Sequence, residues 1–150
     1  MKKLKMISLL LFLWLPISVW ALEYPTLHYD KAIVYDLTDD KVLYELKDTE
    51  KAHVASLTKI LTTITAIESI DNLDDMVTYT ENMKSLVRWD ASVAGLSVGD
   101  KVSYRDLLYA SILPSGADAT TALAVSTSGS ISNFVKKMNE EASKIGMSNS

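Results

Sequence analysis

The chain has 150 residues, which is enough to bury one hydrophobic core and no more. Its formal net charge of −4 at pH 7 argues against a nucleic-acid-binding surface, which would be basic. Without cysteine there is no disulfide framework and no thiolate metal site, and the two histidines have no acidic cluster at ligand spacing beside them. We therefore expect neither a metal ion nor any other cofactor.

Residues 1–21 have the composition of an export signal. Lysines near the start precede an apolar run at 7–20, which is short for a transmembrane helix, and Ala21 supplies a small residue at the end. We predict a secretory signal peptide that is cleaved after Ala21. The alternative is an uncleaved N-terminal anchor.

The segment that follows predicts a β-hairpin. Residues 32–37 and 42–46 alternate between apolar and polar side chains and are rich in β-branched and aromatic residues. Residues 38–41, between them, have the composition of a turn.

A helix is predicted from Ser56 to about residues 71–72. Its apolar side chains recur at the spacing of a helix with one buried face, and they are Leu57, Ile60, Leu61, Ile64 and Ile67.

Ser56 and Lys59 form a Ser-x-x-Lys motif at the start of this helix, and their spacing places both side chains on one face. A serine hydroxyl is a poor nucleophile until a base takes its proton, and a lysine can be that base. The Ser56 amide, at the helix N-terminus, could donate to an oxyanion. The alternative is a helix N-cap at Ser56 beside a solvated Lys59.

Further elements are predicted from capping and turn residues. We expect a short strand at 77–80, a mixed segment at 81–101, a helix from a capping box at 103–106 through Ile112, a break at 113–116, a helix at 118–125, a small-residue loop at 126–129, and a last helix that Ser130 or Ser132 caps and Gly146 stops.

Pro114-Ser115-Gly116 is the second stretch that could carry chemistry. A serine held in a tight turn between two helices can present its hydroxyl to a cleft. The alternative is an N-cap for the helix that begins near Asp118.

Together the two serine motifs resemble the penicillin-recognising enzymes, and most closely the serine-type D-alanyl-D-alanine carboxypeptidases, the low-molecular-mass penicillin-binding proteins. The resemblance extends over nearly all of residues 22–150. It implies a mixed α/β (α+β), penicillin-recognising DD-peptidase/β-lactamase-like fold in truncated form. Residues 22–150 would be the N-terminal part of the catalytic domain, with a helical region at 56–145 and an incomplete antiparallel sheet.

The resemblance also implies roles and partners. Ser56 would be the acyl-ester nucleophile, Lys59 the general base and Ser115 a proton relay. The substrate would be a peptidoglycan stem peptide that ends in D-Ala-D-Ala, and β-lactams would acylate the same serine. The protein would act in the periplasm or on the extracytoplasmic face of the cell membrane or wall. A C-terminal region beyond this chain could associate with the membrane.

The chain departs from the family pattern in two ways. Ala117 stands where the second motif usually has asparagine, and a methyl group cannot donate a hydrogen bond. The sequence also has no Lys-Thr-Gly, which suggests a fragment of a longer protein. Two alternatives stay open: a serine β-lactamase, and a non-catalytic wall-associated scaffold with the same fold.

Overall fold

The computed structural model describes residues 28–147 and residue 150. The predicted signal peptide, residues 1–21, lies outside them. Among the described residues, no helix is long and apolar enough to cross a membrane. The chain divides into two compact units, one ending at Ala52 and the other beginning at His53.

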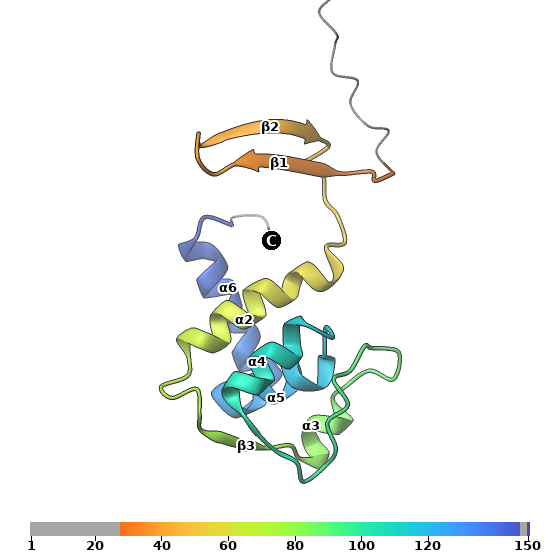
Figure 1. The fold of residues 1–150 in the computed structure, drawn as a ribbon, viewed down its shortest axis with the longest axis vertical. Helices are drawn as coiled ribbons and strands as arrows, with labels where there is room; N and C mark the ends of the chain where they lie inside the picture. Colours follow the sequence, from red (N-terminus) through yellow and green to blue (C-terminus); the bar gives the residue numbers. More distant parts are fainter. Residues whose placement is uncertain (1–27, 148–149) are drawn as a thin grey trace, which may run out of the picture. The chain divides into compact units, whose positions relative to one another are not determined.

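The first unit contains the predicted β-hairpin. Strand β1 (Ala32–Asp36) pairs antiparallel with β2 (Lys41–Leu46), and a bulge interrupts the register after Val34 (Figure 1). The Asp36 carboxylate organises the turn, because it accepts hydrogen bonds from the backbone N–H groups of Thr38 and Asp39. The hairpin prediction is therefore confirmed, with strand ends that differ by one residue.

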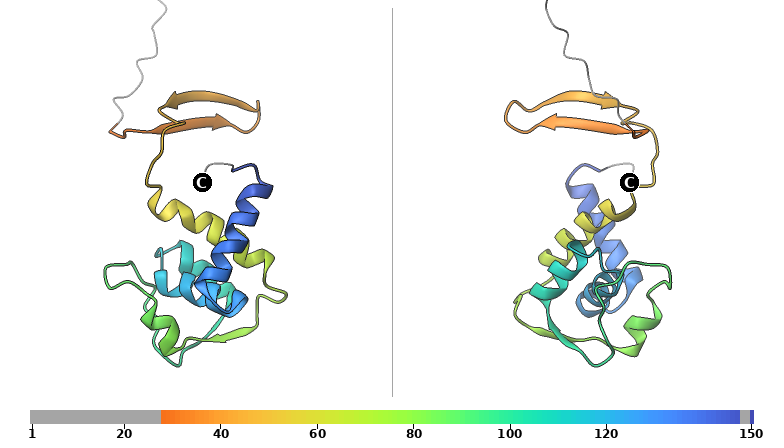
Figure 2. Two further views of the ribbon diagram at one scale, coloured as in Figure 1. Left: turned by 180° about the vertical axis from the view of Figure 1, so that it is seen from behind. Right: turned by 45° about the vertical axis from the view of Figure 1, so that its right-hand side comes forward.

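The second unit is built around helix α5 (Ala117–Ser128), which contacts α2 (Thr58–Glu68), α3 (Glu81–Ser85), α4 (Tyr104–Ile112) and α6 (Ile131–Lys144) (Figure 2). Neighbours can approach α5 from several sides because its side chains are small. Its buried residues are Asp118, Ala119, Thr121, Ala122, Leu123 and Ala124.

The prediction of which face of α2 is buried is wrong. Thr62, Thr65 and Ala66 are the buried residues of this helix, whereas most of the predicted apolar face is exposed, namely Leu57, Ile60, Ile64 and Ile67. The other helices pack against the small side chains of α2. The two threonines can be buried there because their hydroxyls donate to the carbonyls of Thr58 and Leu61, one turn earlier.

Two predicted helix ends also differ from the structure. α2 ends at Glu68 rather than near 71–72. Residues 126–128, predicted as a loop, continue α5. The hydroxyls of Ser126 and Thr127 find partners within the helix by donating to carbonyls one turn back. Helix α5 ends at Ser128, and its C-cap residue Gly129 has a left-handed backbone with φ of 75°.

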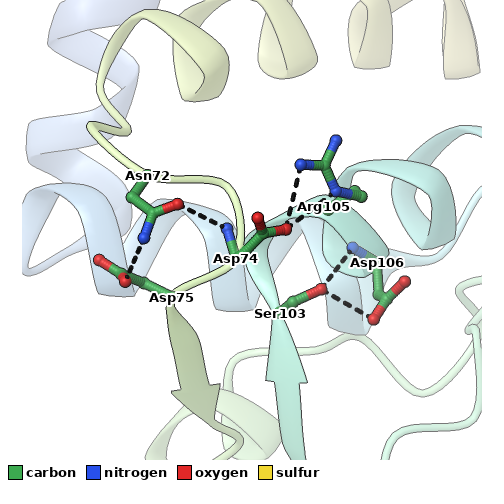
Figure 3. Close-up of polar contacts among 6 residues, drawn as sticks. All are labelled: Asn72, Asp74, Asp75, Ser103, Arg105 and Asp106. Atoms are coloured by element: carbon green, nitrogen blue, oxygen red, sulfur yellow. Dashed lines mark hydrogen bonds and ion pairs between the residues drawn. The ribbon is translucent and has the colours of Figure 1, made fainter.

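The capping predictions for α4 and α6 are confirmed. Ser103 accepts a hydrogen bond from the N–H of Asp106 at 3.1 Å, and its hydroxyl donates to the Asp106 carboxylate (Figure 3). Of the two serines predicted to cap α6, Ser130 does so, by accepting from the N–H of Asn133 at 3.1 Å. A left-handed Gly146 follows the end of α6.

A second small sheet joins the loop after α2 to α4. Strand β3 (Met76–Thr78) overlaps the strand predicted at 77–80. Its antiparallel partner β4 (Lys101–Ser103) was not predicted, because it lies where the mixed segment at 81–101 meets the capping box. An ion pair between Arg105 and Asp74, 3.0 Å apart, fastens this loop to α4 (Figure 3).

Candidate active site

Ser56 lies in η1 (Ala55–Leu57), a 3₁₀ turn that leads directly into α2. Its side chain caps neither helix, because neither η1 nor α2 has a side-chain hydrogen bond at its N-cap. Ala55, just before it, has a left-handed backbone with φ of 46°, which is uncommon for a residue with a side chain. The simple N-cap interpretation of Ser56 is therefore wrong, and its exposed hydroxyl points elsewhere.

The three predicted site residues meet at the Ser56 hydroxyl. Ser115 Oγ donates to Ser56 Oγ at 2.9 Å, although the two residues are 59 positions apart. Lys59 Nζ lies 3.5 Å from the same oxygen, at the outer limit of a hydrogen bond. Among the described residues, half-buried Lys59 has no carboxylate within ion-pair distance. The arrangement therefore brings two hydroxyls and an amine together.

Ser115 is held in a strained turn between α4 and α5. Its φ is 59°, in the left-handed region that a serine adopts at a cost. The turn closes through the N–H of Ser115 to Ile112 O and the N–H of Gly116 to Ala110 O. Ser115 does not cap α5, whose N-cap is Gly116 with no side-chain bond. The N-cap interpretation of Ser115 is therefore also wrong.

Position 116 needs a glycine because neighbouring atoms leave no room for a side chain, and not because of its backbone φ. A Cβ at this position would lie 2.7 Å from the carbonyl oxygen of Ala110 and 2.9 Å from Asp118 Oδ1. Since one of these atoms is backbone, a side chain here would displace the turn that carries Ser115.

Asp118 is a buried carboxylate that the sequence did not mark as part of the site. It accepts hydrogen bonds from the N–H groups of Ala94, Gly95, Leu96 and Ala119 at 2.8–2.9 Å. Burial by itself raises the pKa of this carboxyl, but the four N–H donors together hold the pKa below its usual value. An acidic residue in the first turn of a helix was the available signal.

In the part of the chain that the structure describes, no three His, Asp or Glu side chains are grouped to hold a metal ion. A small open pocket lies between α2, α5 and α6, against Thr62, Phe134 and Met138, and does not include the three site residues.

Comparison with solved structures identifies the class of fold. Penicillin-binding protein 5 from Haemophilus influenzae superposes with a TM-score of 0.74 at 30% identity, over 84% of this chain and 38% of that one. A mutant of the Streptomyces K15 DD-transpeptidase gives a TM-score of 0.76 at 33% identity, over 84% and 52%. The fold is that of the penicillin-binding DD-peptidases, as the sequence predicted.

The family follows from the sequence comparison. The profile of the S11 peptidases, described as D-alanyl-D-alanine carboxypeptidase, matches residues 19–150. The chain therefore belongs to the S11 family of D-alanyl-D-alanine carboxypeptidases.

Two curated relatives show how much of a family member the chain represents. It is 36% identical over 152 residues to the carboxypeptidase DacC of Escherichia coli K12, which covers 95% of this chain and 38% of the relative. It is 33% identical over 122 residues to DacF of Bacillus subtilis 168, which covers 79% of this chain and 31% of the relative. The chain thus spans about a third of the length of these relatives.

Proposed function

We propose that the gene product is an exported serine-type D-Ala-D-Ala carboxypeptidase that removes the terminal D-alanine of peptidoglycan stem peptides. The observation that carries this proposal is the placement of Ser56 Oγ between Ser115 Oγ at 2.9 Å and Lys59 Nζ at 3.5 Å. Membership of the S11 family supplies the substrate class. Export rests on the composition of residues 1–21.

In the proposed acylation step, Ser56 Oγ attacks the carbonyl carbon between the two D-alanines. Lys59 takes the hydroxyl proton as general base, and the backbone N–H of Ser56 donates to the oxyanion that forms. The tetrahedral intermediate collapses to an ester on Ser56 when the C–N bond breaks. The departing amine needs a proton, and Ser115 Oγ relays it from the Lys59 side, because it already contacts Ser56 Oγ.

In the deacylation step, water attacks the ester carbonyl and Ser56 leaves with a proton. Lys59 now accepts a proton from the water, so the same base serves both halves of the reaction. A β-lactam would enter the first step in place of the peptide and would leave its opened ring on Ser56. Ala117 offers no side-chain donor for the substrate carbonyl, so the proposed site relies on the backbone and hydroxyl groups.

The experiment that tests the proposal measures D-alanine release from a peptide ending in D-Ala-D-Ala by the purified gene product. We expect release that Ser56→Ala abolishes. Ser132→Ala, at an exposed serine on α6, is the matched control and should keep the wild-type rate. No release by the wild type, or undiminished release by Ser56→Ala, would overturn the proposal. Rapid hydrolysis of penicillin without D-alanine release would instead indicate a β-lactamase.

A further inference from the structure

The loop that packs against the Ser115 turn is held at its middle by one carboxylate. Between the end of α3 and the start of β4, residues 86–100 contain no helix and no strand. The middle of this loop turns three consecutive N–H groups, those of Ala94, Gly95 and Leu96, toward Asp118. Hydrogen bonds to an ionised carboxylate are stronger than neutral ones, so three consecutive donors on one side chain constrain the path of the loop.

The Asp118 carboxylate has no capacity left for another role. Its side chain is only 3% exposed, and each of its two oxygens accepts two N–H groups, the fourth being that of Ala119. Among the described residues it has no lysine or arginine partner within ion-pair distance. Backbone donors therefore stabilise this anion, with the N-terminus of α5 contributing. It cannot take over the task of the asparagine that Ala117 replaces.

The loop held in this way forms one wall of the Ser115 turn. Ser92 O accepts the N–H of Ala117 at 2.8 Å, and Ala94 Cβ lies 3.0 Å from the space that a side chain on Gly116 would fill. Ser115, directly before Gly116, has the left-handed φ of 59°. A strained backbone of this kind persists only where its surroundings leave it no alternative, and the loop supplies part of those surroundings.

We propose that Asp118 is a positioning residue for the reaction: by holding residues 94–96 against the turn, it keeps Ser115 Oγ within hydrogen-bonding distance of Ser56 Oγ. The inference rests on the proposed function. Asp118 touches neither the substrate nor the reacting atoms, so its effect on the reaction passes through the loop and the turn.

The test measures the rate constant of acylation by a fluorescent penicillin in the purified gene product. Asp118→Asn keeps the shape of the side chain, but its amide nitrogen cannot accept the N–H groups that now meet an oxygen. We expect the rate constant to fall about tenfold or more, since small displacements of a reacting group can cost up to about 100-fold. Asp100→Asn is the matched control, because the exposed Asp100 carboxylate also accepts a backbone N–H in this loop, that of Ser97, but none from residues 94–96.

The rate constant and the final extent of labelling separate positioning from stability. A purely structural role would lower the fraction of protein that takes the label and leave the rate constant of that fraction unchanged. An Asp118→Asn protein that acylates at the wild-type rate constant, or an Asp100→Asn protein that slows equally, would overturn the inference. A wild-type protein that takes no label would contradict the proposed function itself.

A second pair of variants tests the same inference if Asp118→Asn does not fold. Gly95 and Gly99 have φ of 94° and 98°, and a Cβ on either would meet no atom within 4 Å. Alanine therefore strains the backbone equally at both, but only Gly95 donates its N–H to Asp118. We expect Gly95→Ala to slow acylation severalfold and Gly99→Ala to leave it unchanged. Equal effects of the two substitutions would overturn the inference.

Discussion

The hydroxyls of Ser56 and Ser115 lie 2.9 Å apart, although the two residues are 59 positions apart in the sequence. Ser56 is at the start of the segment that leads into α2, and Ser115 is in the turn that separates α4 from α5. Neither hydroxyl caps a helix, so the contact between them is long-range and marks the candidate site.

Lys59→Ala should abolish acylation with little loss of stability. The substitution removes the proposed base, and general base catalysis is typically worth about 10²–10⁴ in rate. The variant should still fold, because the hydrogen bond that it loses, from Lys59 Nζ to Ser56 Oγ, is long and weak at 3.5 Å. Penicillin labelling and thermal unfolding of the variant measure both effects, with Lys84→Ala on α3 as a control at an exposed lysine. Labelling of Lys59→Ala at the wild-type rate would exclude Lys59 as the general base.

Ser115→Ala and Ser115→Gly should both slow the reaction, but the two variants should differ in stability. Each removes the proposed relay hydroxyl, so each should lose about 10²-fold in D-alanine release. Glycine also relieves the left-handed backbone at φ 59°, so it should be more stable than alanine by about 1 kcal/mol. Urea unfolding of the two variants measures the difference.

A glycine variant less stable than the alanine variant would show that the turn is not strained. Equal D-alanine release by wild type and both variants would show that the Ser115 hydroxyl has no part in the reaction.

The stability that Asp118 contributes should be lost in acid. Burial raises the pKa of its carboxyl, but the N–H groups of Ala94, Leu96, Ala119 and Gly95 together lower the pKa by more. The pKa in the folded state therefore lies below the pKa in the unfolded state. A depressed pKa gives stability that is fully present above the unfolded value of about 3.9 and is lost as the pH falls through the folded value.

Wild type should therefore be more stable than Asp118→Asn at pH 7, and the difference should shrink as the pH falls below about 4. Urea unfolding at a series of pH values measures it. The lowered pKa of Glu141, which accepts a hydrogen bond from Lys144, is common to both proteins and cancels in the difference. A difference that is constant or grows toward acid pH would contradict the assignment of an ionised, backbone-bonded Asp118.

The elements that the sequence predicted well are those with local signals. The hairpin follows from alternation, and the caps at Ser103 and Ser130 follow from hydroxyls that bond within one turn. The pair Ser56 and Lys59 is also local, since three residues on a helix bring the side chains together. The contact of Ser115 with Ser56 is not local and came only from the resemblance to a family.

The misjudged features depend on tertiary packing. Periodicity located the apolar face of α2 but could not show that neighbouring helices pack against its threonines instead. The partner strand β4 lies between the mixed segment at 81–101 and the capping box at 103–106, and its position is set by pairing with β3. The role of Asp118 depends on a loop more than 20 positions away, whose path no local rule provides.

The most direct test of the central claim is the location of the ester after the gene product reacts with penicillin. Trypsin cuts after Lys51 and Lys59, so it releases residues 52–59, in which Ser56 is the only serine. Ser115 falls in a separate peptide, residues 106–136. Mass spectrometry should find the penicilloyl group on residues 52–59, with the fragment ions assigning it to Ser56. A penicilloyl group on residues 106–136, or on no peptide, would contradict the assignment of Ser56 as the nucleophile.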